Sequence, residues 1–190
     1  ADIPTVLIGG NHSTPRLRET GNILGIFDHL EGVHPAYEPR AERFVIGDLT
    51  VHAVPHSASP SVRELLAGVE PNPETEFNII TLHVGIAGSN AYRMDEFNEQ
   101  MVDPGDIPDG IDYVALGHFH KFSEVAERMY YSGSTERHGF GEVGQDKGFI
   151  ELDLESGTVD FHRLDVREMI DLAPVDASSM TSSDVLEAIR

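Results

Sequence analysis

The chain has 190 residues, with 33 aspartates and glutamates against 13 lysines and arginines, no cysteine, and a formal net charge of −20 at pH 7. This length suits a single domain, and the lack of cysteine excludes disulfides and thiolate metal sites. No apolar run is long enough to cross a bilayer, and the acidity argues against the broad basic face typical of DNA-binding domains.

The N-terminal part of the chain predicts a strand followed by an amphipathic helix. Apolar residues make up most of 4–9, which favours a strand, and their spacing over 18–31 favours a helix. Leu24 would lie off the apolar stripe of this helix. The core-facing stripe is expected to contain Ile23, Ile26, Phe27 and Leu30.

A hairpin and a short helix are predicted next. Residues 43–46 and 49–54 predict two strands of a hairpin joined at Gly47-Asp48, an inverted but workable two-residue turn. Ser59-Pro60 then precedes a short apolar pattern over 61–68, which predicts a helix with serine as its cap, proline at the first turn and glycine after its end.

The second half of the chain predicts mostly strands. Residues 77–83 favour a buried strand, and 84–110 are expected to be irregular because they are rich in Gly, Asn, Asp and Pro. Further strands, including an antiparallel meander, are expected near 111–116, 122–126, 129–132, 147–154 and 158–164. A polar linker at 171–181 precedes a final short helix that Ser183-Asp184 would cap.

Polar residues of metal-ligand type follow three of these strands. The first strand runs into Gly10-Asn11-His12, the strand at 77–83 ends in His83, and the apolar run at 113–116 leads into Gly117-His118-Phe119-His120. Neutral imidazole binds zinc, manganese and iron, and open α/β sheets place their sites at strand C-termini. Taken singly, Asn11 also suits a turn residue and His83 a strand-end histidine that binds nothing.

In this order the motifs resemble the second half of the calcineurin-like metallophosphoesterase pattern, which runs Asp-x-His, Gly-Asp, Gly-Asn-His, a lone His and Gly-His-x-His. Neither of the first two motifs precedes Asn11. The resemblance therefore implies an α/β fold: a partial metallophosphoesterase core, a layered β-sandwich flanked by helices, without its N-terminal βαβ part. The start at Ala1 fits a processed, truncated or recombinant product.

Downstream segments are similar to one branch of this family, the SbcD-type nuclease subunit of the double-strand-break repair complex. The similar stretches are 112–121, 131–137, 140–142, 147–149 and 164–170. The resemblance implies a nuclease core over 1–165, and a linker with the start of a capping region over 166–190. It also implies a cytoplasmic location, DNA as substrate, an SbcC-type ABC ATPase partner and a homodimer formed through the helix at 18–31, with Leu24 at the contact.

The resemblance also implies a role for each motif residue. Asn11, His83 and His118 would bind one of two divalent ions, expected to be Mn²⁺, and His120 would bind the other. The bridging aspartate and the remaining ligands would come from the two motifs that do not precede Asn11. His12 would act as the catalytic group that protonates or stabilises the leaving oxygen. The site in this chain is therefore expected to be incomplete.

Cationic residues close to these motifs could bind phosphate despite the overall acidity. Arg16, Lys121 and Arg137 are the candidate substrate-binding residues, with Arg18 and His138 beside them. The alternative is that the arginines pair with acids such as Glu19 and Glu136. His52 and His56 match no motif and are expected to be structural or surface residues.

Three functions remain open from the sequence. The first is a manganese-dependent DNA exonuclease or endonuclease. The second is a small-molecule or nucleotide phosphoesterase of the same superfamily. The third is a non-catalytic module that keeps the fold and has lost half of the site. With no bridging aspartate assigned, the 190 residues alone are expected to have little nuclease activity, because two cations would repel each other without it.

Overall fold

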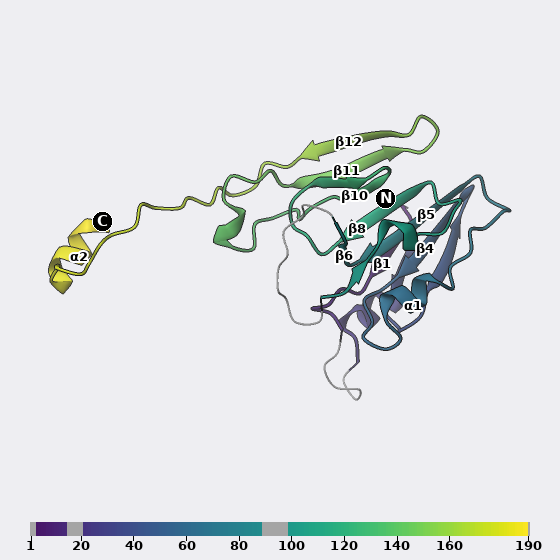
Figure 1. Ribbon diagram of the computed structural model, residues 1–190, viewed down its shortest axis with the longest axis horizontal. Helices are drawn as coiled ribbons and strands as arrows, with labels where there is room; N and C mark the ends of the chain where they lie inside the picture. The colour runs from purple at the N-terminus through teal and green to yellow at the C-terminus, as the bar shows by residue number, and fades with distance from the viewer. Residues whose placement is uncertain (1–2, 15–20, 89–98, 190) are drawn as a thin grey trace.

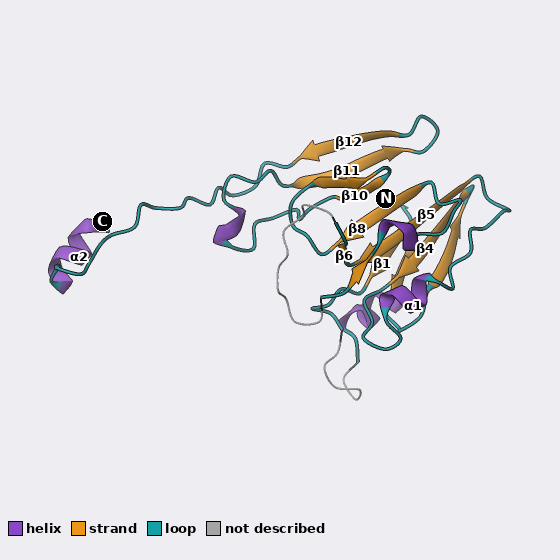
Figure 2. Ribbon diagram, in the orientation of Figure 1, coloured by secondary structure: helices purple, strands orange, loops and turns teal. Residues whose placement is uncertain are grey.

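The computed structural model describes residues 3–14, 21–88 and 99–189, and its main element is a six-stranded sheet (Figures 1 and 2). In spatial order the strands are β3 (Glu42–Ile46), β4 (Leu49–Val54), β5 (Phe77–His83), β8 (Tyr113–Gly117), β10 (Met129–Tyr131) and β9 (Ser123–Ala126). Strands β4, β5, β8 and β10 run parallel, whereas β3 and β9 are antiparallel to their neighbours. The C-terminal ends of β4, β5 and β8 therefore meet at one edge.

Three strand pairs accompany this sheet in the described part of the chain. Two pairs are parallel and the third is an antiparallel hairpin. They are β1 (Thr5–Ile8) with β2 (Val33–Ala36), β6 (Gly85–Ile86) with β7 (Met101–Val102), and β11 (Gly148–Asp153) with β12 (Thr158–Arg163). Figure 1 shows the β11–β12 hairpin beside β10. Stacked rings link the hairpin to the chain next to β9, since the Phe122 and Phe161 centroids lie 4.4 Å apart.

The described helices are few and short. They are η1 (Ile23–His29), α1 (Val62–Leu66), η2 (Pro104–Asp106), η3 (Phe140–Glu142) and α2 (Ser182–Ala188). No helix among the described residues is both long and apolar enough to cross a membrane. Figure 1 shows α2 well away from the sheet, at the end of an extended segment that follows β12.

The core lies between the sheet and α1. Val62 and Leu66, one turn apart on α1, are both fully buried, as are Ile80 and Leu82 of β5. Burying a side chain of this size stabilises the fold by about 1.5–3 kcal/mol. Ser61 caps α1, and its capping box with Glu64 satisfies backbone donors of the first turn. This packing fixes β5 and thereby the position of His83 at its end.

The predicted strands are confirmed, but their pairing is more complex than a meander. The hairpin at Gly47-Asp48 forms as expected, with Ile46 opposite Leu49 and Gly47 at φ +59°. The antiparallel meander expected among the last five strands does not form: β9–β10 and β11–β12 are antiparallel pairs, but β10 pairs in parallel with β8. Strands β2, β6 and β7 lie in segments for which no strand is predicted.

The caps of two helices also differ from expectation. Ser61, which follows Pro60, caps α1 in place of Ser59, because its hydroxyl accepts from the Glu64 amide. Thr181 rather than Ser183 caps α2, and its side chain accepts from the Asp184 amide. In both helices the capping residue stands three positions before an acidic residue, which is the spacing of a capping box.

The helix expected at 18–31 is wrong in type and in orientation. The described part is the 3₁₀ helix η1, which Asn22 begins by accepting a hydrogen bond from the Leu24 amide. Ile23 is 63% exposed and Ile26 60% exposed, whereas Leu24 is half-buried. Three residues per turn place Ile23 and Ile26 on the same side of η1, and this side faces solvent. Residues 18–20 lie outside the described part.

Candidate functional site

Four histidine-bearing strand ends meet at one edge of the protein. β1 leads to Asn11 and His12, β4 to His56, β5 to His83 and β8 to His118. The His56 amide donates to the Gly9 carbonyl, which holds the end of β1 beside the end of β4, and the Gly9 amide donates to the carbonyl of Ala36 in β2. The parallel register of β5 with β8 then places His83 opposite Gly117. The predicted convergence of strand ends is therefore present in the structure.

The imidazole of His83 lies between two glycines. A Cβ on Gly10 would approach His83 Cε1 to 2.6 Å, and a Cβ on Gly117 would approach His83 Nδ1 to 3.0 Å. Such contacts are tighter than real Cβ atoms normally make, so the glycines of both motifs leave the space that the ring fills. His83 Nε2 lies within hydrogen-bond distance of Asn11 Oδ1, at 2.9 Å, which joins two of the predicted ligands directly.

His118 is buried and held in an unusual backbone conformation. Its φ is +105°, a region that a bulky residue adopts only when its surroundings impose it, and such strain is concentrated at functional sites. Its ring packs edge-on against that of His83, with centroids 5.3 Å apart. His118 Nε2 is buried and has no hydrogen-bond partner among the described residues, and Glu99 Oε1 lies 3.5 Å from it.

The donor atoms of this group are of the types that bind a divalent ion, but the described residues bring too few of them together for a full set of ligands. Asn11, His83 and His118 offer an amide oxygen and imidazole nitrogens, which suit manganese, iron or zinc. Across 3–14, 21–88 and 99–189, however, no three histidine, aspartate or glutamate side chains gather as metal ligands would. Glu99 supplies a carboxylate beside His118 that the motifs gave no reason to select. Metal binding by these three residues, and the need for further ligands, stay predictions.

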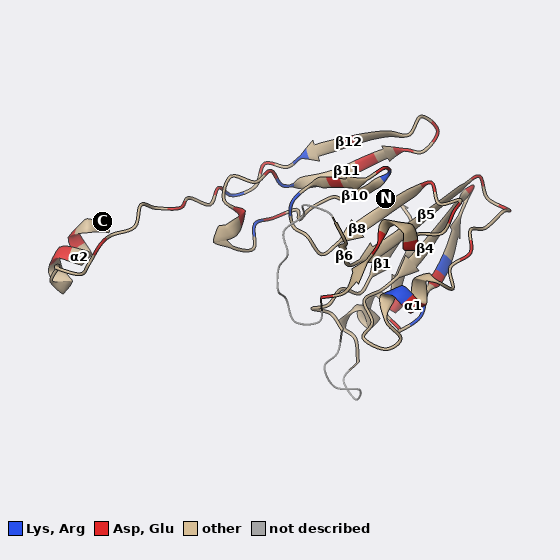
Figure 3. Ribbon diagram, viewed as in Figure 1, with Lys and Arg blue, Asp and Glu red and all other residues tan. Residues whose placement is uncertain are grey.

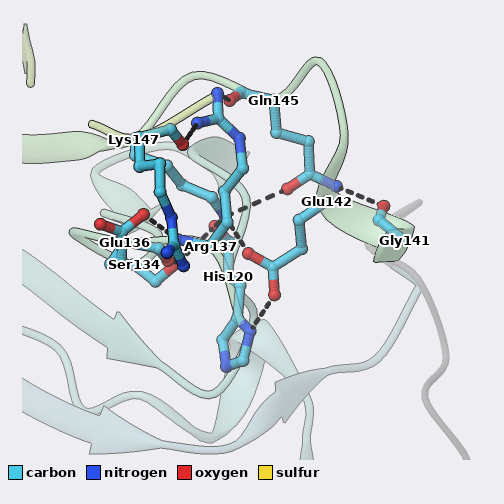
Figure 4. Close-up of polar contacts among 9 residues, drawn as sticks. His120, Ser134, Glu136, Arg137, Gly141, Glu142, Gln145 and Lys147 are labelled. Atoms are coloured by element: carbon cyan, nitrogen blue, oxygen red, sulfur yellow. Dashed lines mark hydrogen bonds and ion pairs between the residues drawn. The ribbon is translucent and has the colours of Figure 1, made fainter. Parts of the chain in front are cut away.

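His120 belongs to a second group of polar residues (Figure 4). Its Nδ1 lies 2.8 Å from Glu142 Oε1, and the other oxygen of Glu142 forms an ion pair with Lys147 Nζ. The side chain of Lys147 is completely buried, and Glu142 is 12% exposed. The ring of His138 lies 4.9 Å from that of His120, centroid to centroid. In this group, His120 therefore contacts residues other than Asn11, His83 and His118.

Glu142 is the residue that orients this second group. Burial on its own would raise the pKa of the Glu142 carboxyl, but its bonds to Lys147 and His120 outweigh that effect and hold the pKa at about 2. The group is therefore a carboxylate at neutral pH and can only accept hydrogen bonds. Glu142 lies 22 residues from His120 in the sequence, and no metal motif contains it.

The predicted substrate-binding residues differ in their exposure and in their contacts. Lys121 is exposed directly after His120, and Arg16 lies outside the described residues. Arg137 donates to the carbonyl oxygens of Arg167 and Gln145 over 2.7 and 3.0 Å, so its guanidinium joins the η3 loop to the segment after β12. His12 is exposed in the turn after Asn11. Substrate binding by these residues and catalysis by His12 stay predictions.

His56 lies at this edge although it matches no motif. It is 3% exposed, and its Nδ1 lies 2.9 Å from Thr14 Oγ1, which also donates to the Gly10 carbonyl. His56 thereby ties the loop of Asn11 to the end of β4. Of the two roles expected for His52, structural or surface, the structure shows the first, since its Nε2 bonds to Asn78 in the buried part of the sheet.

An Asp-x-His triplet does occur later in the chain, but it does not complete the site. Asp160-Phe161-His162 lies inside β12, whereas His83 is the last residue of β5. His162 Nε2 pairs with Glu151 Oε2 across the hairpin at 2.7 Å, and its ring stacks on Phe149. This triplet is part of an exposed hairpin.

Comparison with known proteins finds several similar sequences, including two DNA repair proteins. The DNA double-strand break repair protein Mre11 of Thermoplasma acidophilum is 28% identical over 182 residues, covering 88% of this chain and 46% of that protein. The protein of the same name from Methanopyrus kandleri is 26% identical over 201 residues, covering 93% of this chain and 43% of that protein. No family model matches the chain.

These similarities confirm the resemblance to the SbcD-type, or Mre11-type, nucleases among the calcineurin-like metallophosphoesterases. The chain spans less than half the length of the curated relatives it matches. Its mixed fold, with a mostly β core and few helices, is compatible with part of a metallophosphoesterase domain.

Proposed function

We propose that this chain forms part of a metal-dependent DNA nuclease that processes double-strand breaks. The observation that carries the proposal is the convergence of Asn11, His83 and His118 from three strand ends around the glycine-lined ring of His83. The two Mre11 proteins are named for double-strand break repair, which supports DNA as the substrate. An ABC-type ATPase of the SbcC type is the partner that the resemblance implies.

In this proposal Asn11, His83 and His118 hold one divalent ion, and His120 contributes to a second, with Mn²⁺ as the expected metal. Such ions, when bound, supply a hydroxide nucleophile and neutralise charge on the phosphodiester. The exposed His12 would donate a proton to the leaving oxygen, or stabilise its charge. The incomplete ligand set implies that the 190 residues alone bind metal weakly and cleave DNA poorly.

The test measures metal binding and cleavage separately. Manganese titration followed by electron paramagnetic resonance should show binding that His118→Ala weakens by at least about tenfold, as loss of a ligand would. His162→Ala is the matched control, because His162 is an exposed histidine on β12. End-labelled duplex DNA should be cut only with a divalent cation present. Binding indifferent to His118→Ala, or cleavage in excess chelator, would reject the proposal.

A second candidate is a phosphoesterase acting on small phosphates, and the charge of the chain favours it. Figure 3 shows acidic residues on strands, turns and α2, with fewer basic residues among them, and the net charge is −20. A field of this sign opposes the approach of a polyanion more than that of a small phosphate ester. Turnover of bis-p-nitrophenyl phosphate by a protein that leaves duplex DNA intact under the same conditions would favour this candidate.

A homodimer is part of the proposal, and η1 offers the surface for it. Ile23, Ile26 and Leu30 are 63%, 60% and 52% exposed, so this short segment presents three exposed apolar side chains. Light scattering should show a two-fold dimer that Ile26→Glu dissociates. Val45→Glu is the matched control and should leave the dimer intact, because Val45 is a 58% exposed apolar residue on β3. A wild-type monomer would exclude the dimer.

A further inference from the structure

Two neighbouring side chains hold the imidazole of His120 in one protonation pattern. Glu142 accepts through Oε1 from His120 Nδ1 over 2.8 Å, and its Oε2 is paired with Lys147 Nζ. Figure 4 shows the His120 ring directed away from Lys147, with the Glu142 carboxylate reaching its edge. Because an ionised carboxylate can only accept, Nδ1 must carry the proton. In the neutral ring, the lone pair is then on Nε2.

Burial and polar contacts hold the side chain of Lys147 in place. Its side chain is fully buried, and its ammonium has three donors. Besides the ion pair with Glu142, Nζ donates to the His120 carbonyl over 2.9 Å and to Gln145 Oε1 over 3.4 Å. A buried ammonium without its acceptors would destabilise the fold. The contacts of Lys147 therefore keep one oxygen of the Glu142 carboxylate, Oε2, directed towards its ammonium.

The backbone of His120 is fixed at the same point. The Ser134 amide donates to the His120 carbonyl over 3.1 Å, alongside Lys147. A Cβ on Gly133 would lie 2.9 Å from that carbonyl oxygen, and Gly133 has φ +78°, so only glycine lets the loop approach so closely. Both the main chain and the ring of His120 are therefore held by the segment 133–147.

We propose that Glu142, fixed by Lys147, is a positioning residue that sets His120 in its Nδ1–H tautomer and so presents Nε2 as a ligand for a divalent cation. Metal-ligating histidines commonly use their second nitrogen in this way, and the partner sets both the tautomer and the ring orientation. The metal-binding half of this inference rests on the proposed function, whereas the tautomer does not.

The tautomer can be observed directly without metal. Long-range ¹H–¹⁵N spectra of the metal-free protein, recorded above about pH 8 where ordinary imidazoles are neutral, distinguish the protonated from the unprotonated ring nitrogen. The wild-type ring of His120 should be protonated at Nδ1. In Glu142→Gln, Lys147 will select the amide oxygen and turn the amide NH₂ towards His120, so the proton should move to Nε2. Glu136→Gln, which alters an exposed glutamate of the same loop, should leave the tautomer unchanged.

A double variant distinguishes positioning from a general structural role. In Glu142→Gln/Lys147→Met the ammonium no longer competes for the amide oxygen, which can again accept from Nδ1. The Ser134 amide still holds the His120 carbonyl. The second substitution should therefore restore the Nδ1–H tautomer that the first one removed. A merely destabilised loop would not recover in this way.

Metal titration completes the test. Manganese affinity should fall about 10- to 100-fold in Glu142→Gln and return at least partly in the double variant. An Nε2–H tautomer in the wild type, or a tautomer unmoved by Glu142→Gln, would overturn the inference whatever the metal does. Wild-type protein that binds no manganese, yet shows the expected tautomers, would instead overturn the proposed function and the metal-binding half of the inference.

Discussion

His83 and His120 are both predicted metal ligands, and the protein holds their rings in different ways. His83 fits between Gly10 and Gly117, where an added Cβ would crowd the ring, and its partner Asn11 is neutral. His120 is bonded to a carboxylate that a buried ammonium fixes in turn. The first ring is positioned mainly by the space left for it, and the second mainly by charge.

This difference matters for what each region can bind. Near Asn11, His83 and His118, the carboxylate of Glu99 lies 3.5 Å from His118 Nε2. Around His120 the negative charge of Glu142 is already compensated by Lys147, so it orients the ring without adding net charge. Under the proposed function, two divalent cations at close range would repel each other, so additional anionic ligands would be expected in both regions.

The largest expected loss of stability follows from a substitution in the region around His120. Lys147→Met removes a buried ammonium and leaves the Glu142 carboxylate without its main partner, which should lower the free energy of unfolding by about 3–5 kcal/mol. Urea denaturation measures this change. Arg63→Met is the control, because Arg63 is 58% exposed and its bonds to Asp103 and Asp106 are screened by solvent and should contribute little. Equal losses in the two variants would mean that burial of Lys147 does not set this region apart.

A smaller effect is expected in the region positioned by space. Gly10→Ala places a methyl group 2.6 Å from His83 Cε1, and overpacking of this kind costs about 1–3 kcal/mol and displaces the ring. Denaturation should show the loss, while the ring signals of His120 stay as in the wild type. Gly139→Ala is the matched control, since nothing lies within 4 Å of its added Cβ and its φ is −163°. Changed His120 signals in Gly10→Ala would show that the two regions are coupled.

Much of the fold could be predicted because local pattern and packing agree. Two strand-like segments around the Gly47-Asp48 turn locate the hairpin, and the apolar run ending in His83 locates β5. Pattern and packing disagree at η1, where a spacing of three and four residues predicts an α-helical core stripe. In the 3₁₀ form, Ile23 and Ile26 share an exposed side instead.

The site could be predicted only as far as its motifs extend. Asn11, His83 and His118 stand at strand ends, so their convergence follows from parallel strands. Their glycine neighbours gain meaning only in three dimensions, where one ring contacts both. Glu142 and His56 carry no signal of their own, because their partners lie 22 and 42 residues away in the chain.

The smallest expected effect concerns the loop that carries Asn11. Thr14 Oγ1 bonds to the Gly10 carbonyl and to His56 Nδ1, so it connects this loop to the end of β4. Thr14→Val keeps the shape but removes the hydroxyl, and should lower the free energy of unfolding by about 0.5–1.5 kcal/mol. Thr14→Ser keeps the hydroxyl and should lose less. Manganese affinity should fall in Thr14→Val because Asn11 is less firmly placed, whereas the His120 tautomer should not change. A Thr14→Ser variant as unstable as Thr14→Val would show that the methyl group, rather than the hydrogen bonds, holds the loop, and that this region is positioned by packing throughout.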